Sequence, residues 1–366
     1  MRPKQVIKSV ISKSAFLLPF RATKSAQQAR VALQTYQPCP MGTFAGENIV
    51  NLQYDLQIII PAYNVEKYIR ECMESVISQV THYRYLVTVV NDGSTDRTGD
   101  ILAEYAGNGN NACDIEVITQ KNRGLSAARN TCLKTIHGKY LMLLDSDDVI
   151  PQATIENMLN MAEKTNADIL QGSWYSFDAD RRKNHILKEE GVLSDNRGIV
   201  SGFAWGKLYK YTVMENFRFP EGYWFEDTPI SFMIAAMPFR FVATKRLVYG
   251  YRLNPQGITQ TAGKRRKSVD SYWITELCLR EFPSFGLAYD QRAYEYLLRQ
   301  ALVNWSRTNQ QPLEVREAIF VLTRELREQY FSGYHTEISK LRKLERAIEK
   351  RQFRKFEFLA WCYRGA

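Results

Sequence analysis

The sequence has few of the residues and patterns that mark several common protein classes. Only four histidines occur in 366 residues, without the clustered ligands of a structural zinc site. The six cysteines are widely spaced and form no C-x-x-C pair, so reduced cytosolic thiols are expected rather than a disulfide framework. No apolar run approaches the ~18 residues that cross a bilayer, and the apolar part of the N-terminus is too short and broken for a signal peptide. No G-x-G-x-x-G follows the first predicted strand, which argues against a dehydrogenase.

Positive charge is concentrated at the two ends of the chain, whose net charge is +10. Residues 1–34 hold seven Lys or Arg and no acid, and residues 340–366 hold nine Lys or Arg against three Glu. Solvated tails explain this pattern, and so does attraction to an anionic membrane surface. The run FRKFEFLAWCY favours the membrane because aromatic residues alternate with cations. No nucleic-acid partner is expected, since no nucleic-acid motif accompanies the charge. The expected location is the cytoplasm, peripheral to the inner face of the cell membrane.

The chain is expected to have three parts: a basic extension at 1–53, an α/β domain at 54–261 and a helical region at 262–366. In the middle part, apolar β-branched runs alternate with segments of helical period. Strands are predicted at 55–60, 85–90, 114–119, 140–144 and 167–175, and helices at 65–79, 95–107, 125–137 and 154–164. This alternation predicts right-handed crossovers and a mainly parallel sheet flanked by helices. The long helical segments after 262 are also candidates for packing a homo-oligomer.

Three polar clusters follow predicted strands: PAYN at 61–64, NDGSTD at 91–96 and DSDD at 145–148. Each alone has a structural explanation, since turns, helix caps and exposed loops use the same residues. The carboxyl ends of parallel strands meet at one edge of a sheet, where ligands bind. Three clusters at that edge therefore predict a ligand site.

In the run LMLLDSDD, a predicted apolar strand is followed directly by clustered carboxylates. Such a loop is explained by a bound divalent cation, which cancels the repulsion between the acids. Mg²⁺ takes one or two carboxylates and completes its shell with water and phosphate oxygens. The pattern also fits the nucleophile loop of haloacid-dehalogenase-type phosphatases, with Asp145 as nucleophile. In that family, however, the motif lies on the first strand, whereas here three strand–helix units precede it.

The ordered set of motifs resembles the family 2 glycosyltransferases, which have the GT-A fold. The resemblance runs from about Leu56 to Thr261. It rests on IIIPAYNVEKYIRECMESVISQ, VVNDGSTDRTGDIL, KNRGLSAARNTCL, GKYLMLLDSDDVI, FAWGKLYK and FEDTPISF, in that order. It implies a metal-dependent hexosyl- or N-acetylhexosaminyltransferase with a nucleotide-sugar donor, UDP being the expected nucleotide. The acceptor implied is a glycan or lipid-linked hydroxyl in bacterial surface polysaccharide synthesis.

The resemblance also implies roles for individual residues. The nucleotide and donor sugar would be bound by Pro61, Ala62, Tyr63, Asp92, Asn122, Gly124, Arg129, Asp145 and Ser146, with Asp92 contacting the base. The cofactor, Mn²⁺ or Mg²⁺, would be held by Asp147. Further substrate contacts would come from Lys207, Tyr223, Trp224 and Arg252.

The pair Glu226–Asp227 matches the family's E-D motif, in which the aspartate is the catalytic base. A structural alternative is that Asp227 caps the helix that begins near Pro229. A non-catalytic sugar-binding relative is a further alternative, although the acidic loop and the E-D pair are both intact. As a base, Asp227 would serve a single displacement that inverts the anomeric configuration.

Overall fold

A computed structural model describes residues 21–107, 113–194, 202–254, 257 and 261–363. The chain divides into two compact units, Met41–Gly257 and a second unit made of Met1–Pro40 with Ile258–Ala366. The second unit thus joins the two ends of the chain. This division differs from the expected boundaries at 53/54 and 261/262, chiefly because the N-terminal segment is not a separate extension.

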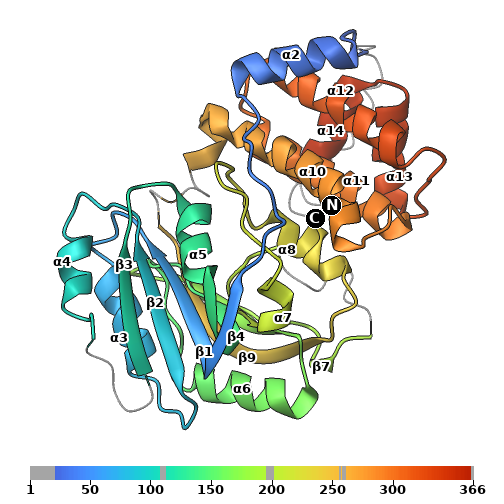
Figure 1. Cartoon of the computed structure of the whole chain (residues 1–366). Coiled ribbons are helices and arrows are strands. Elements are labelled where there is room, and N and C mark those ends of the chain that lie inside the picture. Colours follow the sequence, from blue (N-terminus) through green and yellow to red (C-terminus); the bar gives the residue numbers. More distant parts are fainter. Residues whose placement is uncertain (1–20, 108–112, 195–201, 255–256, 258–260, 364–366) are drawn as a thin grey trace. The chain divides into compact units, whose positions relative to one another are not determined.

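The unit Met41–Gly257 is an α/β domain (Figure 1). Its strands are β1 (Ile49–Ala62), β2 (Tyr85–Asn91), β3 (Cys113–Thr119), β4 (Thr135–Leu143), β5 (Ile169–Phe177), β6 (Arg182–His185), β7 (Gly191–Val192), β8 (Lys207–Lys210) and β9 (Phe241–Arg252). Its α-helices are α3 (Ile69–Ile77), α4 (Thr98–Ala103), α5 (Leu125–Leu133), α6 (Thr154–Thr165), α7 (Tyr211–Met214) and α8 (Thr228–Phe232).

The described strands form one nine-stranded sheet in the order β3-β2-β1-β4-β8-β5-β9-β7, with β6 paired to β5. Strands β3, β2, β1 and β4 are parallel, and β8 runs antiparallel to both β4 and β5. Strands β2 and β3 lie on one side of β1, and β4, the next strand in the chain, lies on the other side. The carboxyl ends of β1 and β4 therefore flank a topological switch point, where open α/β sheets bind ligands.

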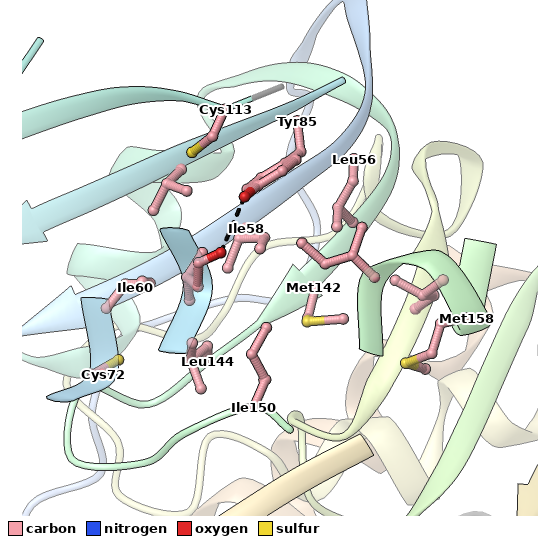
Figure 2. Packing of buried hydrophobic residues seen from close by; sticks show 14 of the residues in the cluster. Leu56, Ile58, Ile60, Cys72, Tyr85, Cys113, Met142, Leu144, Ile150 and Met158 are labelled. Atoms are coloured by element: carbon pink, nitrogen blue, oxygen red, sulfur yellow. Dashed lines mark hydrogen bonds between the residues drawn. The ribbon is translucent and has the colours of Figure 1, made fainter. Parts of the chain in front are cut away.

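The core on one face of the sheet comes from alternate strand residues packed under α3, α4 and α6 (Figure 2). Leu56, Ile58 and Ile60 of β1 are fully buried in this cluster. Gln57 points to the other face, where its Nε2 donates to Thr88 Oγ1 and to the Cys132 carbonyl near the end of α5. Both faces are covered, as the near-continuous apolar strands predict.

The predicted helix at 125–137 is too long, since α5 ends at Leu133 and β4 begins at Thr135. Thr135 and Ile136 pair with Ile49 and Val50 of β1, so strand pairing overrides the helical pattern. Gly138 lies inside β4 rather than closing a helix. A Cβ there would be 2.4 Å from the backbone nitrogen of Gln57, so the close approach of β1 requires glycine.

The second unit is helical. Its α-helices are α2 (Ala26–Tyr36), α10 (Asp270–Glu281), α11 (Gln291–Thr308), α12 (Leu313–Tyr330), α13 (Ser339–Glu349) and α14 (Phe353–Tyr363). Within the described part of the chain, no helix is long and apolar enough to cross a membrane.

Helix α2 packs against α12 (Figure 1). Ser25 caps α2 in a capping box with Gln28, and Ala29 and Leu33 bury the same face of the helix. Lys24 pairs with Glu317 at 2.9 Å. Some cations of this segment therefore form ion pairs inside the helical unit. Composition alone does not show such contacts, so it predicted a separate extension.

Two aromatic residues of the C-terminal run are packed inward. Phe353 and Phe356 of α14 are buried and lie 5.5 and 5.1 Å, centroid to centroid, from Phe320 of α12. The expected basic aromatic tail is thus a structural helix, although Trp361 stays 43% exposed. Phe353 and Phe356 therefore serve packing within the helical unit rather than a surface.

Candidate active site

Strands β1, β2 and β4 end at the same edge of the sheet. The register pairs Ala62 with Asn91 and Ile59 with Leu143, so the segments 61–64, 91–96 and 145–148 lie at neighbouring strand ends. Asn64 ties the first two together, because its backbone N–H donates to Ser94 Oγ at 3.1 Å. The three polar clusters therefore come together, as their positions in the sequence predict.

Asp92 is buried and organises the loop that precedes α5. One carboxylate oxygen accepts from the backbone N–H of Arg123 and from Gln120 Nε2, and the other accepts from the backbone N–H of Gly124. Gly124 has φ +88°, a conformation that favours glycine. Asp92 is thus fastened to the 120–124 loop, in which Asn122 is exposed. Its contact with a base stays a prediction.

Pro61 and Ala62 are buried at the end of β1, and Tyr63 is 47% exposed beside them. This exposure leaves the Tyr63 ring available to a ligand at the switch point. Ser146 is buried within the acidic loop.

Arg129 of α5 connects the acidic loop to the E-D segment. One terminal nitrogen donates to Asp145 Oδ1 at 2.8 Å and the other to Glu226 Oε1 at 2.7 Å. The guanidinium is almost fully buried and lies over the ring of Phe219, 5.0 Å from its centroid. The two carboxylates raise the pKa of Arg129 against the effect of burial, so the cation stays charged.

The three aspartates of the acidic loop have different environments. Asp148 is fully buried and accepts from the Tyr249 hydroxyl and from the backbone N–H of Arg252, both at 2.7 Å. Burial raises its pKa well above the ordinary range. Asp147 accepts from Asn254 Nδ2 at 3.1 Å, and burial raises its pKa as well. Asp148 therefore anchors the loop to β9.

The acidic loop fits a hard divalent cation. One oxygen of Asp145 accepts from Arg129 and one oxygen of Asp147 accepts from Asn254. Both carboxylates lie on the loop that follows β4, at the sheet edge where the polar clusters meet. One or two carboxylates are the usual protein contribution to a Mg²⁺ site, so Asp145 and Asp147 fit such an ion.

Arg252 has a different position from the one expected of a phosphate or acceptor contact. Its Nε donates to the Asp147 carbonyl at 2.7 Å and a terminal nitrogen donates to Glu71 at 2.6 Å. The guanidinium also lies 4.4 Å from the ring centroid of Phe177. Through these contacts, Arg252 supports the acidic loop from β9.

Lys207 also departs from its expected role. The residue is fully buried, and its Nζ donates to the Phe203 carbonyl at 2.5 Å. Burial lowers the pKa of Lys207 to about 7, and the charge of Asp227 opposes this effect. The ammonium therefore lies inside the protein near Asp227 rather than reaching outward to a phosphate.

The E-D pair begins a short helix. Glu226 is buried against Arg129, and burial raises the pKa of Glu226 to about 7. Asp227 occupies the N-cap position of α8, yet its side chain makes no capping hydrogen bond. The preceding Phe225 has φ +63°, a strained conformation of the kind found at functional sites. The capping explanation for Asp227 thus lacks its defining contact.

The aromatic segment before the E-D pair is only partly exposed. Tyr223 is 5% exposed, which does not fit the expected stacking on a sugar, whereas Trp224 is partly exposed. Tyr249 and Asn254 hold the acidic loop and were not predicted from the sequence. The alternation Tyr249-Gly250-Tyr251 within a strand was the available signal, since it places both tyrosines on one face.

The architecture is the GT-A fold. The structure is similar to a crystal structure of S. aureus TarS residues 1–349 determined with UDP-GlcNAc. The match has a TM-score of 0.66 and 22% identity, and it covers 85% of this chain and 91% of that one. The predicted α/β architecture with a helical C-terminal region is confirmed by this likeness.

Residues 57–234 match the family model described as Glycosyl transferase family 2. This domain therefore belongs to the family 2 glycosyltransferases, as the motifs predicted. Glycosyltransferase GlyA of Streptococcus pneumoniae is 34% identical over 222 residues, 56% of this chain and 31% of that protein. The uncharacterized glycosyltransferase EpsJ of Bacillus subtilis is 32% identical over 56% of this chain and 63% of its own length. The chain thus spans less than two thirds of these relatives. The family leaves the phosphatase alternative without support.

Replacing Lys207 by methionine should change the pH dependence of stability. The folded pKa of about 7 lies below the ordinary 10.5, so the unfolded state binds more protons between these values. Through this group, the free energy of unfolding of the wild type should rise with pH across that window, by at most about 1.4 kcal/mol per pH unit. The Lys207→Met variant should lack this increment. Denaturant titrations across the window measure it.

The matched control is Lys210→Met, which changes a partly exposed lysine on the same strand. Its slope should follow the wild type. Identical slopes for the wild type and Lys207→Met would show that Lys207 titrates normally.

Proposed function

We propose that this chain is an inverting glycosyltransferase that moves a hexosyl or N-acetylhexosaminyl group from a UDP-sugar to a hydroxyl of a glycan or lipid-linked acceptor. The observation that carries this proposal is the Arg129 bridge, which joins the acidic loop at Asp145 to the pair Glu226–Asp227. One carboxylate of the bridge, Asp145, belongs to the predicted donor side, and the other, Glu226, is the neighbour of the predicted base Asp227. A role in cell-surface polymer synthesis is supported by relatives such as the minor teichoic acid biosynthesis protein GgaB of Bacillus subtilis, which is 30% identical over 62% of this chain and 26% of that protein.

The donor would lie at the switch point between β1 and β4. Tyr63 and the loop fastened to Asp92 would contact the nucleoside, and Asp145 would contact the ribose or donor sugar. UDP is favoured as the nucleotide because TarS, which shares the fold, was crystallised with UDP and with UDP-GlcNAc. Asp147, with Asp145 beside it, would hold Mn²⁺ or Mg²⁺, which supplies positive charge to the departing diphosphate.

The chemical step would be a single displacement. Asp227 accepts the proton of the acceptor hydroxyl, and the oxygen attacks the anomeric carbon of the donor as the bond to the diphosphate breaks. Because attack and departure occur on opposite faces, the anomeric configuration inverts. Glu226, held by Arg129, would fix the position of the Glu226–Asp227 segment while Asp227 accepts the proton.

Asp227→Asn should keep donor affinity and lose transfer. The amide preserves size and polarity but cannot accept the proton, and loss of a general base costs on the order of 10²–10⁴-fold in rate. Calorimetric titration with UDP-sugars and an assay of released UDP measure the two properties. Asp180→Asn, in an exposed turn, is the control and should behave as the wild type. Transfer by Asp227→Asn at the wild-type rate would remove Asp227 from its role, and donor binding without turnover in the wild type would favour a non-catalytic relative.

Removal of divalent metal should abolish UDP release, and added Mn²⁺ should restore it. Asp147→Asn should weaken Mn²⁺ binding, measured by electron paramagnetic resonance of the free ion, because one carboxylate oxygen is lost from the site. Asp180→Asn should bind Mn²⁺ as the wild type does. Full turnover in excess chelator would make the acidic loop metal-independent.

The same proposal places the enzyme in the cytoplasm at an anionic membrane surface, through the outer face of α13. Lys340, Lys343, Arg346 and Lys350 are exposed at helical spacing, while Leu341 and Leu344 pack inward. Among the described ion pairs, none involves these four cations. Each well-placed cation contributes about 1 kcal/mol at an anionic leaflet. Association through the C-terminal helices stays a further prediction.

Changing Lys340, Lys343 and Lys350 to Glu should abolish co-sedimentation with vesicles that contain phosphatidylglycerol. The charge reversal removes the attraction while leaving the buried face of α13 intact. The control changes three exposed lysines of the sheet domain to Glu: Lys67, Lys188 and Lys245. Equal vesicle binding by the α13 variant and the wild type would contradict the membrane role, as would equal binding to vesicles of phosphatidylcholine alone.

A further inference from the structure

The ring of Phe203 is the outer end of a stack of three aromatic rings. Phe203 is nearly parallel to Trp205, with centroids 4.4 Å apart and planes at 7°. Trp205 is in turn nearly parallel to Tyr249, at 4.4 Å and 11°. Exposure decreases along the stack, from 39% at Phe203 to 6% at Trp205 and 0% at Tyr249. Phe203 thus presents a ring to solvent while its neighbours support it from below.

The stack is fixed at its inner end by the acidic loop. The Tyr249 hydroxyl donates to Asp148 at 2.7 Å and accepts from the backbone N–H of Asp145 at 3.1 Å. At the outer end, the buried Lys207 ammonium donates to the Phe203 carbonyl. Because both ends are held, the exposed ring is pre-oriented and would lose little conformational entropy when a ligand covers it.

A second aromatic side chain stands beside this stack. The ring of Trp174 lies 5.8 Å from Phe203 at 75° and 5.3 Å from Trp205 at 77°. Trp174 is held by His185, whose ring stacks on it at 3.7 Å, and His185 Nε2 lies 3.1 Å from Ser176 Oγ. Phe203 and Trp174 therefore form a corner of two nearly perpendicular rings, with polar groups at its border.

This aromatic corner lies between the acidic loop and the E-D segment. Strand β8 begins four residues after Phe203, at Lys207, and it pairs with β4 just before Asp145, with Leu208 opposite Met142. On the other side, a Cβ at Gly202 would lie 3.3 Å from Ser231 Oγ in α8, the helix that begins after Asp227. The proposed donor site, in contrast, is at the switch point between β1 and β4, on the side of β4 that faces away from β8.

The surface matches the chemistry of a neutral sugar ring. A pyranose has an apolar face of C–H groups and a rim of hydroxyls, so it pairs with a fixed aromatic face and nearby hydrogen-bonding side chains. In an enzyme that joins two sugars, the donor occupies the switch point. The ring on the β8 side of the acidic loop would then belong to the acceptor.

We propose that Phe203 and Trp174 form the acceptor subsite, in which a neutral pyranose ring of the acceptor stacks on Phe203 and presents a hydroxyl toward Asp227. The subsite rests on the proposed glycosyltransferase function and deepens it by assigning the acceptor class. Phe203 acts as the stacking surface and Trp174 as the wall that restricts the orientation of the ring. Lys207 is a positioning residue that holds the Phe203 backbone.

The test measures binding of methyl β-glucopyranoside and methyl N-acetyl-β-glucosaminide to the full chain by saturation-transfer NMR, in the presence of UDP and Mn²⁺. Phe203→Ala and Trp174→Ala should weaken binding of a bound glycoside about tenfold, the loss expected for one aromatic contact. Phe203→Tyr should bind as the wild type, whereas Phe203→Leu should not, because an apolar side chain without a ring cannot stack. Affinity for UDP should be unchanged in all four variants. Trp361→Ala removes a ring of the helical unit with a similar exposure, 43% against 39% for Phe203, and is the control.

Three results would overturn the subsite: binding of neither glycoside by the wild type, equal binding by Phe203→Ala and the wild type, or full binding by Phe203→Leu. Loss of UDP affinity in Phe203→Ala would also overturn it, since the ring would then belong to the donor side. A different result would contradict the proposed function: a wild-type protein that neither binds nor turns over any UDP-sugar. That result would also remove the acceptor assignment. If the wild type turns over a UDP-sugar but glycoside binding does not depend on Phe203, the subsite is rejected and the proposed function stands.

Discussion

The buried guanidinium of Arg129 is the interaction on which the rest of the site depends. It comes from α5 and is almost fully buried. It pairs with the carboxylates of Asp145 and Glu226, which are more than eighty residues apart in sequence. Removing one partner of such a buried pair leaves an uncompensated charge, which costs about 3–5 kcal/mol. The geometry of the acidic loop and that of the E-D segment are therefore coupled, so any ligand that moves one loop acts on the other through a single side chain.

The parallel half of the sheet could be predicted because its signals are local. Continuous apolar strands alternate with short amphipathic helices from β1 to β5, and each polar cluster follows a strand end. The parts that were missed depend on distant partners. Strand β8 is antiparallel and only four residues long, and the start of β4 is decided by pairing with Ile49 and Val50. The helix α2 was not predicted because the positive charge of this segment was interpreted as a solvated extension. Its signal was the helical spacing of Ala29 and Leu33, which form the apolar face that α12 covers.

The candidate site shows the same division. The segments of Asp92 and Asp145 were predicted to lie together because parallel topology fixes where strand ends lie, whereas the place of Glu226 was implied only by the resemblance to the family. Motif spacing could not show which side chains face outward. Lys207 and Arg252 were expected to meet a ligand because both are cations near the site, yet one is buried beneath Phe203 and the other braces Asp147. A residue type sets what a side chain can bind, whereas burial and neighbours decide whether it is available.

These supporting contacts explain why the acidic loop tolerates its own charge. Asp148 is stabilised by Tyr249 and the Arg252 backbone, Asp147 by Asn254, and Asp145 by Arg129. Each carboxylate thus has its own donor from a different element, which spreads the repulsion over β9, α5 and the segment after β9. Tyr249 serves twice, since its hydroxyl holds Asp148 while its ring supports the stack that ends at Phe203. One side chain thus connects the acidic loop to the exposed aromatic surface.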